Sequence, residues 1–515
     1  MHRKGKLVKR DPHHLLGIQI AFALILAFSP AACTALPPQA SDTATTPVIT
    51  GQPTPLLETP TAGPEPSPSV PLTSSPETPT PLPKPSPSTA QADVVFHNGS
   101  ILTMETDQPE AQALAIQGES ILAVGSDEDV LPLAGPQTQL IDLQGRTLMP
   151  GFVDAHTHIL SSPDHYGTDL EGVQDLALMY GITTLADASG TPDLLQRLQP
   201  LEREDKLRVR TSVYMMYNSA CGDAMGEWYR EYAPTREPGE MLRIGGVKIF
   251  ADGGSCNAPA VSFEYPSGVG RGDLYFAQEE LDQVMADAQA RGYQVAIHAL
   301  GDRAVEQAQV AIAAALDGQP NTLRHRVEHN AVLRPDLMGR YSEIGIVPLI
   351  FGRYATCAKL GATSKFKYVV PAEYQSWEWP WRELLDANPG LPIAWHGDDP
   401  PIPPLDPLID LYSFVTRRDI AEDGSICEPP DWLAANTITV DEALRLMTMG
   451  SAYALFRDEE VGSIAPEKLA DLILLSENPV TVNPDRIKDV EVLMTMIGGR
   501  VEYCAPGHEI PCPVS

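Results

Sequence analysis

The central part of the chain alternates short apolar runs with helical stretches, and this alternation limits the possible fold more than any other feature of the sequence. Helical stretches such as QEELDQVMADAQARG separate several of the runs. The runs have strand length and recur eight times, at 152–159, 183–189, 209–217, 245–252, 294–300, 324–330, 345–350 and 392–398. Eight β/α units in succession predict a (β/α)8 TIM barrel over residues 148–458, with functional side chains at the carboxyl ends of its strands.

Short β-branched runs flank the predicted barrel on both sides. Before it, ADVVFHNGSILTM and ALAIQGESILAVG read as strands broken by Asn-Gly and Gly-Glu turns. After it, VEVLMTMIGGRVEY has the same character. We therefore predict that residues 92–147 and 459–504 form one small β-sandwich assembled from both flanks, followed by a tail at 505–515. The expected fold class is α/β with an additional β domain.

Residues 1–33 resemble a bacterial lipoprotein signal peptide. Basic residues precede the apolar run 15–28, and two alanines lead into Cys33. In such signals the cysteine is lipidated and becomes the new first residue. The apolar run is too short for a typical membrane span, and an ordinary signal peptide or an uncleaved anchor is the alternative. We therefore expect a protein that is exported and lipid-anchored to the outer side of a bacterial membrane.

Residues 34–91 are composed almost entirely of Pro, Thr, Ser and Ala. Such a composition cannot bury a core and favours extended conformations, so it predicts a disordered tether. The whole chain carries a formal net charge of −32, with 68 acidic and 36 basic residues. Without a local basic patch, this balance argues against nucleic acid as a partner.

The chain contains seven cysteines, and six of them lie beyond Cys33. In an exported protein an even number of cysteines permits disulfides. Cys504 and Cys512, in CAPGHEIPC, are close enough in sequence to suggest a pair. The other four show no metal-like spacing and are expected to be buried free thiols: Cys221, Cys256, Cys357 and Cys427.

Several polar side chains fall at the carboxyl ends of predicted strands. In the first strand Asp154, His156 and His158 share one face by the two-residue period. Further candidates lie in later strands, namely Lys248 in the fourth, His298 in the fifth, His329 in the sixth and Asp398 in the eighth. Alone, each histidine is more often a hydrogen-bonded structural residue and the lysine a salt-bridged one. Their coincidence at one rim of one barrel favours a metal site.

A series of motifs in this order resembles the amidohydrolase superfamily, and more closely its YtcJ-like branch, the amidohydrolase 3 family. The matching stretches are LMPGFVDAHTH, GGVKIFADG, AIHALGDRAV, LRHRVEHN, GDDPP, TVDEALRLMTMGSAYAL and GSIAPEKLADLILL. They extend over about residues 92 to 503, nearly the whole predicted folded part. The resemblance implies a hydrolase that cleaves an amide, N-acyl or N-formyl carbon–nitrogen bond of a small organic substrate.

The resemblance also implies two divalent metal ions, usually zinc. The implied ligands are His156 and His158 for one ion, and His298 and His329 for the other. Lys248 would bridge the ions as an N-carboxylated lysine, whose carbamate is an anion with two oxygens, whereas a free ammonium is a poor ligand. Asp398 would bind a metal and act as the catalytic base toward the attacking water.

The stretch before Asp398 departs from the family pattern. It reads His396-Gly397-Asp398, where the family usually has Gly-Ser-Asp, and His396 shares the inward face of the strand with Asp398. We consider a contact to substrate or to a metal ligand, or simple packing, as its role. His325 shares a face with His329 but lies deeper, and we expect it to be structural.

Two other functions stay open at this point. The first is a mononuclear deaminase that acts on a cyclic amidine and uses the same scaffold with an unmodified Lys248. The second is a tethered protein that binds a metal or ligand without catalysis and would not need Asp398 as a base. The expected partners are a small-molecule substrate, a membrane through the lipid anchor only, and a second copy of the chain in a homodimer that the sequence does not exclude.

Overall fold

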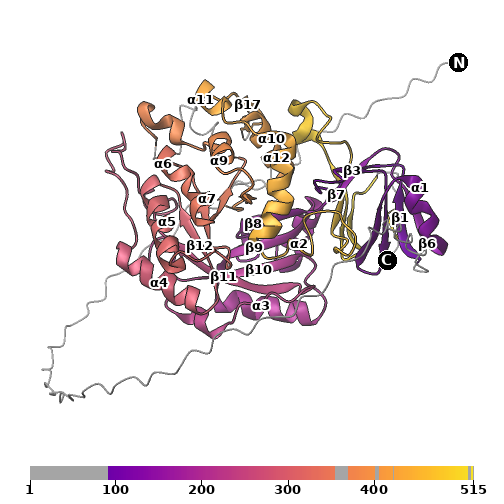
Figure 1. Cartoon of the computed structure of the whole chain (residues 1–515), viewed down its shortest axis with the longest axis horizontal. Helices are drawn as coiled ribbons and strands as arrows, with labels where there is room; N and C mark the ends of the chain where they lie inside the picture. The colour runs from indigo at the N-terminus through magenta and orange to yellow at the C-terminus, as the bar shows by residue number, and fades with distance from the viewer. Residues whose placement is uncertain (1–90, 354–368, 401–404, 422, 508–511, 514–515) are drawn as a thin grey trace, which may run out of the picture. The chain divides into compact units, whose positions relative to one another are not determined.

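The structure of the chain is a computed structural model, and Figure 1 draws its described residues in colour. The described residues are 91–353, 369–400, 405–421, 423–507 and 512–513. The predicted signal peptide with Cys33 and all but the last residue of the predicted tether lie outside them. Within these ranges, no helix combines the length and the apolar character needed to cross a membrane.

Eight parallel strands in chain order form the central sheet, and the prediction of a TIM barrel is confirmed. Figure 1 shows these strands at the centre of the molecule with helices outside them. The strands are β8 (Phe152–Thr157), β9 (Ile182–Gly190), β10 (Arg210–Met216), β11 (Leu242–Phe250), β12 (Gln294–Ala299), β13 (Arg326–His329), β14 (Val347–Ile350) and β15 (Ala394–Trp395).

Helices connect the strands and cover the outer face of the sheet. They are α2 (Leu170–Met179), α3 (Pro192–Arg203), α4 (Gln278–Ala290), α5 (Asp302–Leu316), α6 (Pro335–Met338), α7 (Arg340–Ile344), α9 (Trp381–Ala387) and α10 (Pro407–Thr416). Local sequence sets their starts: the Thr191 side chain accepts a hydrogen bond from the Leu194 N–H, and proline occupies the first helical position of α3. Between β10 and β11, residues 217–241 contain only the short 3-10 helix η4 (Trp228–Glu231). The third β/α unit therefore lacks its α-helix.

The barrel closes where the segment after β15 meets β8. The backbone N–H of Asp398 donates to the carbonyl of His156 over 3.1 Å, and the N–H of His158 donates to the carbonyl of Asp399 over 2.7 Å. Three of the residues that these bonds join are candidate ligands from the sequence, namely His156, His158 and Asp398. Closing the barrel thus brings His156 of β8 and His158, which follows β8, next to Asp398.

A β domain is built from both flanks of the barrel, as the sequence predicts. Its six-stranded sheet has the order β20-β19-β18-β7-β2-β3, and its four-stranded sheet has the order β5-β4-β1-β6. Strands β7 and β18 come from opposite flanks and pair antiparallel. Apolar side chains of both sheets, among them Phe96, Leu114, Leu474 and Met494, pack in one core.

The strands of this β domain come first from the amino-terminal flank and then from the carboxyl-terminal one. They are β1 (Ala92–His97), β2 (Ser100–Leu102), β3 (Glu110–Ala111), β4 (Ala113–Gln117), β5 (Ser120–Gly125), β6 (Ala134–Asp142), β7 (Thr147–Pro150), β18 (Leu472–Leu475), β19 (Val492–Ile497) and β20 (Arg500–Cys504). Between barrel and β18 lie a small hairpin and a helical segment: β16 (Asp419–Ile420), β17 (Ile426–Cys427), α11 (Asp431–Ala434), α12 (Val440–Arg445), η6 (Leu446–Gly450) and α13 (Ser451–Ala454).

The cysteines differ in part from the prediction. Cys504 and Cys512 form a disulfide, as their spacing suggests. Cys221 and Cys256 also form one, across a separation of 35 residues, so the expectation of free thiols is wrong for both. Cys427 is disulfide-bonded as well, so the expectation is wrong for it too, and Cys357 lies outside the described residues. The Cys221–Cys256 bond joins the loop after β10 to the loop after β11 at the rim of the barrel.

Candidate metal centre

His156 lies at the centre of the candidate site, almost fully buried at 1% exposure. Its Nδ1 atom is 2.5 Å from Oε2 of Glu328. On the other side of the ring, Nε2 is 3.4 Å from Lys248 Nζ and 3.5 Å from Asp398 Oδ1. A carboxylate on one nitrogen fixes the ring orientation and leaves the other free for a ligand. His156 therefore presents Nε2 to the centre.

His158 presents the same nitrogen to the same place. Its Nε2 is 3.1 Å from Asp398 Oδ1, and its Nδ1 is 2.7 Å from the Ser189 hydroxyl at the end of β9. Asp398 adopts a φ of 55°, a left-handed conformation that Asp tolerates better than most residues. Burial raises the pKa of Asp398, but the hydrogen bond and charge of His158 outweigh it, so the net pKa is lowered. Asp398 is a carboxylate at neutral pH.

Lys248 extends from β11 toward His156 and is fully buried. Its Nζ lies 4.7 Å from the centre of the Phe250 ring, and within the described ranges no carboxylate lies at ion-pair distance from it. Burial lowers the pKa of Lys248 to about 8. A buried ammonium without an ion-pair partner is costly. Its environment therefore favours loss of the proton from Lys248 or covalent modification of its amine.

His298 and His329 reach the centre by different routes. His298 points inward from β12, and its Nε2 atom donates to the Gly253 carbonyl over 2.9 Å, which leaves Nδ1 for a ligand. His329 would face outward by the strand period, but it adopts a φ of 74° at the end of β13. This left-handed turn places its ring centroid 4.6 Å from that of His298 and 4.8 Å from that of His156.

The structure thus gathers the candidate metal ligands predicted from the sequence at one end of the barrel. Atoms of His156, His329 and Asp398 that can bind a metal lie within 4.8 Å of one another. Imidazole nitrogens and a carboxylate are the usual ligands of zinc and similar divalent ions. Both ring nitrogens of the buried His396 lack a hydrogen-bond partner in the part of the chain that the structure describes. Such a donor set fits a bound metal ion.

Glu328 and Arg326 are buried charged residues that the sequence reasoning missed. Both point into the barrel from β13 and have no exposed side-chain surface, with Arg326 Nε 3.0 Å from Glu328 Oε1. The guanidinium also lies 4.2 Å from the centre of the Tyr214 ring and donates to the Ala155 carbonyl. A chain of polar contacts therefore runs from Arg326 through Glu328 to His156. The signal was present in HRVEHN, where two opposite charges alternate at strand spacing.

His325 is structural, as expected from its depth. Its Nδ1 accepts a hydrogen bond from the Val295 N–H over 3.0 Å, and its Nε2 is 2.6 Å from Gln289 Oε1 of α4. Both of its ring nitrogens are thus paired outside the barrel interior.

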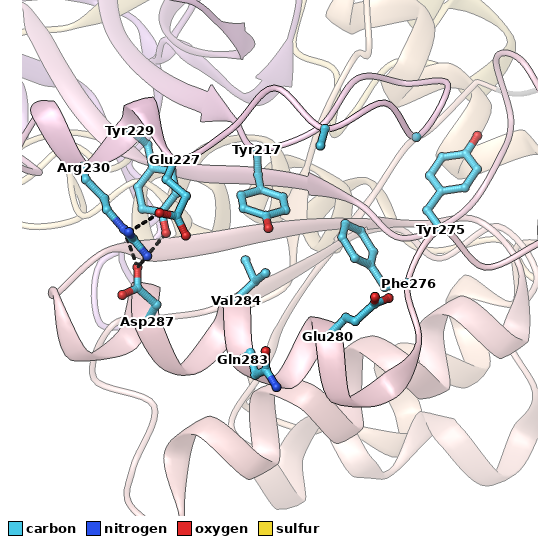
Figure 2. A pocket seen from close by; sticks show the side chains of 12 residues that line it. Tyr217, Glu227, Tyr229, Arg230, Tyr275, Phe276, Glu280, Gln283, Val284 and Asp287 are labelled. Atoms are coloured by element: carbon cyan, nitrogen blue, oxygen red, sulfur yellow. Dashed lines mark hydrogen bonds and ion pairs between the residues drawn. The ribbon is translucent and has the colours of Figure 1, made fainter. Parts of the chain in front are cut away.

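A separate cavity of about 520 Å³ lies between the end of β10, the segment 222–230 and α4. Figure 2 shows Tyr217, Tyr229 and Phe276 in its wall together with an ion-paired cluster around Arg230. None of the candidate metal ligands lines this cavity. It belongs to the outer layer of the barrel and is not the metal centre.

A (β/α)8 barrel that gathers buried imidazoles, a lysine and a carboxylate at the carboxyl ends of its strands defines a metal-dependent hydrolase. The chain belongs to the amidohydrolase family: the model of this family, amidohydrolase 3, matches residues 139–178 and 173–503. Its reaction class is the hydrolysis of carbon–nitrogen bonds other than peptide bonds. The resemblance to this superfamily, drawn from the sequence motifs, is confirmed.

Relatives with known names and structures agree with this class. The chain is 28% identical over 271 residues to the Bacillus subtilis protein YtcJ, a match that covers 52% of this chain and 48% of YtcJ, about half of that relative. It is 21% identical over 559 residues to the N-substituted formamide deformylase of Arthrobacter pascens, covering 81% and 99% of the two chains. An uncharacterized metal-dependent hydrolase from Pyrococcus furiosus has the same fold, with a TM-score of 0.61, 19% identity, and coverage of 75% and 100%.

Proposed function

We propose that the protein hydrolyses an amide, N-acyl or N-formyl bond of a small organic molecule with water activated by two divalent metal ions, which we expect to be zinc. The observation that carries this proposal is that candidate ligands from β8, β11, β12, β13 and the segments after β8 and β15 gather at one end of the barrel, where ligand atoms of His156, His329 and Asp398 lie within 4.8 Å of one another. The Arthrobacter relative, named as an N-substituted formamide deformylase, supports the substrate class.

The candidate ligands divide into two groups around Lys248. The first group is His156 and His158, and the second is His298 and His329. Bound ions would supply a water of lowered pKa and positive charge for the substrate carbonyl oxygen. The protein itself supplies buried, oriented donors: Glu328 and the Gly253 carbonyl each hold one ring nitrogen and aim the other at the centre.

Lys248 is suited to becoming an N-carboxylated bridge. Because burial lowers its pKa to about 8, part of the population carries a neutral amine near neutral pH. The nitrogen lone pair of that amine forms a bond to the carbon of carbon dioxide while the electrons of one C=O π bond move to oxygen, and the nitrogen releases a proton to solvent. The product is an anion with two oxygens, which suits a buried position between two cations. Lys248→Ala should lose metal and regain part of its activity when short carboxylic acids are added.

Asp398 is the base in this proposal. Its lowered pKa keeps it ionised, and its Oδ1 atom lies next to Nε2 of both His156 and His158. It would accept the proton of the attacking water and pass it to the departing nitrogen. Asp398→Asn should retain the barrel fold and lose hydrolysis, whereas wild-type activity in this variant would contradict the assignment.

The decisive experiment is elemental analysis of the protein purified without chelators, followed by a panel of N-acyl and N-formyl compounds. We expect about two zinc-like ions per chain and hydrolysis that a chelator abolishes and added metal restores. A control variant, His165→Gln, changes an exposed histidine outside the site and should behave as wild type. Absence of metal after metal and bicarbonate are supplied would overturn the proposal and favour a binding protein without catalysis.

A mononuclear deaminase is the second candidate, and one observation favours it. Among the described residues, the metal-binding atoms that cluster most closely come from His156, His329 and Asp398, a set that suits a single ion. In this case Lys248 would stay unmodified. One ion per chain and release of ammonia from cyclic amidines would support this second function, and two ions would contradict it.

We further propose that the protein is exported and anchored through a lipid on Cys33. The basic and apolar residues before Cys33 support this, and the Cys221–Cys256 and Cys504–Cys512 disulfides suit an oxidising compartment. Labelled palmitate should enter the wild-type protein but not Cys33→Ser, and only the wild type should partition into detergent. Equal partitioning of both would refute the anchor. Light scattering of the Cys33→Ser protein tests the expected homodimer.

A further inference from the structure

The cavity beside α4 is a feature that the metal centre does not explain. Its volume of about 520 Å³ lies within the range of about 300–1,000 Å³ that small-molecule sites occupy. It lies in the third β/α unit, where residues 217–241 contain the short 3-10 helix η4 instead of an α-helix. In a regular barrel, a helix after β10 would pack beside α4. The cavity therefore lies where that helix would stand.

The helix α4 contributes one continuous face to the cavity. Its lining residues recur at intervals of three and four positions, which places them on one side of a helix. They are Glu280, Gln283, Val284 and Asp287. A helix after β10 would cover this face, but the segment 222–230 stands opposite it and leaves a space between them.

The wall opposite α4 is held in place by the protein itself. The Met225 N–H donates to the carbonyl of Tyr217 over 2.9 Å, which folds the segment back onto the end of β10. From the same segment, the Tyr229 hydroxyl donates to Asp287 Oδ2 of α4 over 2.7 Å. A site with walls that are already ordered pays little entropy when a ligand enters.

Aromatic rings line the cavity between these walls. The ring centroid of Tyr217 lies 6.0 Å from that of Phe276 and 6.4 Å from that of Tyr229. Figure 2 shows the Tyr217 ring between the other two, above Val284. The face of an aromatic ring carries negative partial charge and attracts cations, which is how aromatic sites recognise alkylated ammonium groups.

The charged residues of the lining favour a cation as well. They are three carboxylates and one guanidinium. Arg230 already forms ion pairs with Glu227 and Asp287, so it is occupied by the protein. The third carboxylate, Glu280, accepts the Ala277 N–H over 2.9 Å, and no cation lies at ion-pair distance from it among the described residues. Figure 2 shows Glu280 on the opposite side of the cavity from the Arg230 cluster. Negative charge is therefore in excess, and the lining is complementary to a positive ligand.

We propose that this cavity binds a small organic cation, an alkylated ammonium compound whose carbon groups contact Tyr217 and Phe276 and whose charge faces Glu280. Such a compound fits the lining better than a bare metal ion does, because aromatic ring faces are not ligands for divalent metals. The site is separate from the metal centre, since none of the candidate metal ligands lines the cavity. The proposal goes beyond the hydrolase function and does not depend on it.

The test compares choline with 3,3-dimethyl-1-butanol, a neutral molecule of the same shape in which carbon replaces the charged nitrogen. Calorimetric titration of the full chain should show one choline site per chain and at least about tenfold weaker binding of the neutral compound. Tyr217→Leu and Phe276→Leu each remove a ring and should weaken choline binding about fivefold, whereas Tyr217→Phe keeps the ring and should stay within about twofold of the wild type.

The charge is tested separately from the rings. Glu280→Gln removes the negative charge but can still accept the Ala277 N–H, because glutamine serves at this helix position as glutamate does. We expect an intact helix by circular dichroism and about fivefold weaker choline binding. Glu279→Gln is the matched control: it changes an exposed carboxylate of α4 outside the cavity and should bind choline as the wild type does.

Three results would overturn the proposal. The first is equal binding of choline and the neutral compound, and the second is wild-type affinity in both Tyr217→Leu and Glu280→Gln. The third is a choline site that is absent or that disappears when a chelator removes metal, since the latter would locate the probe at the metal centre. The proposed hydrolase function is tested by metal content and hydrolysis, so it stands or fails independently of choline binding.

Discussion

Glu328→Gln should weaken both the fold and the metal site, because Glu328 joins Arg326 to His156 in the barrel interior. Its two oxygens lie 3.0 Å from Arg326 Nε and 2.5 Å from His156 Nδ1. Glutamine keeps the shape but removes the charge, so the fully buried guanidinium loses its counter-ion. Removing one partner of a buried ion pair typically costs about 3–5 kcal/mol of stability. We expect a loss of this size in the free energy of unfolding of the metal-free protein, measured in urea.

The effect on metal binding should be separate from the effect on stability. Loss of a carboxylate that orients a ligating histidine typically lowers metal affinity by about 10–100-fold, which competition with a chromophoric chelator measures. The double variant Glu328→Gln/Arg326→Met removes both charges and should recover most of the stability, since replacing a whole buried pair by apolar groups is often neutral. Its metal affinity should stay low.

An exposed ion pair on the surface serves as the control for this prediction. Glu477→Gln breaks an exposed ion pair with Arg486, and it should change the unfolding free energy by under about 1 kcal/mol. If the double variant recovers metal affinity along with stability, Glu328 acts only on the fold and does not orient His156. Unchanged stability in the single variant would refute the assignment of a buried ion pair.

Three further predictions concern parts of the fold outside the centre. Replacing Cys221 and Cys256 by Ser opens a 35-residue loop and should lower the unfolding free energy by about 2–4 kcal/mol, as seen by urea unfolding beside a reduced wild-type sample. Asp471→Ala removes the partner of the buried Arg210, 2.6 Å away, and should cost about 3–5 kcal/mol in the same assay. Burial raises the pKa of Asp406 to about 6, above the unfolded value of about 3.9. The contribution of Asp406 to stability is therefore complete below pH 4 and is lost as the pH rises to 6. Asp406→Asn should remove this pH dependence from thermal melts between pH 4 and 6.

Much of the fold could be predicted because it depends on local patterns. The alternation of apolar runs and helical stretches determines the eight parallel strands, and the β-branched flanks determine a domain shared by both ends of the folded part. Strand period alone also places His156 and His158 on one inward face. The missing helix after β10 and the Cys221–Cys256 bond depend on how loops meet in space, which no local pattern encodes.

The candidate centre shows the same division between local and non-local causes. The strand period would turn His329 away from the barrel interior, and only its left-handed backbone at the end of β13 brings it in. The same period correctly assigns Glu328 and Arg326 to the interior, although a charged pair inside a barrel looks unfavourable until its partners are known. What the sequence could not show was the pairing, since Glu328 is satisfied by residues from two strands at once.

The hydrogen bonds that close the barrel are also the ones that assemble the site. The backbone groups of His156 and His158 bond to Asp398 and Asp399, and the Gly397 N–H donates to Asp154 Oδ1 over 3.0 Å. A barrel whose last strand shifted in register would lose its closure and separate the β8 histidines from the carboxylate together. Selection for a closed barrel therefore also maintains the ligand geometry. A substitution that breaks these hydrogen bonds should weaken the closure of the barrel and the ligand geometry together.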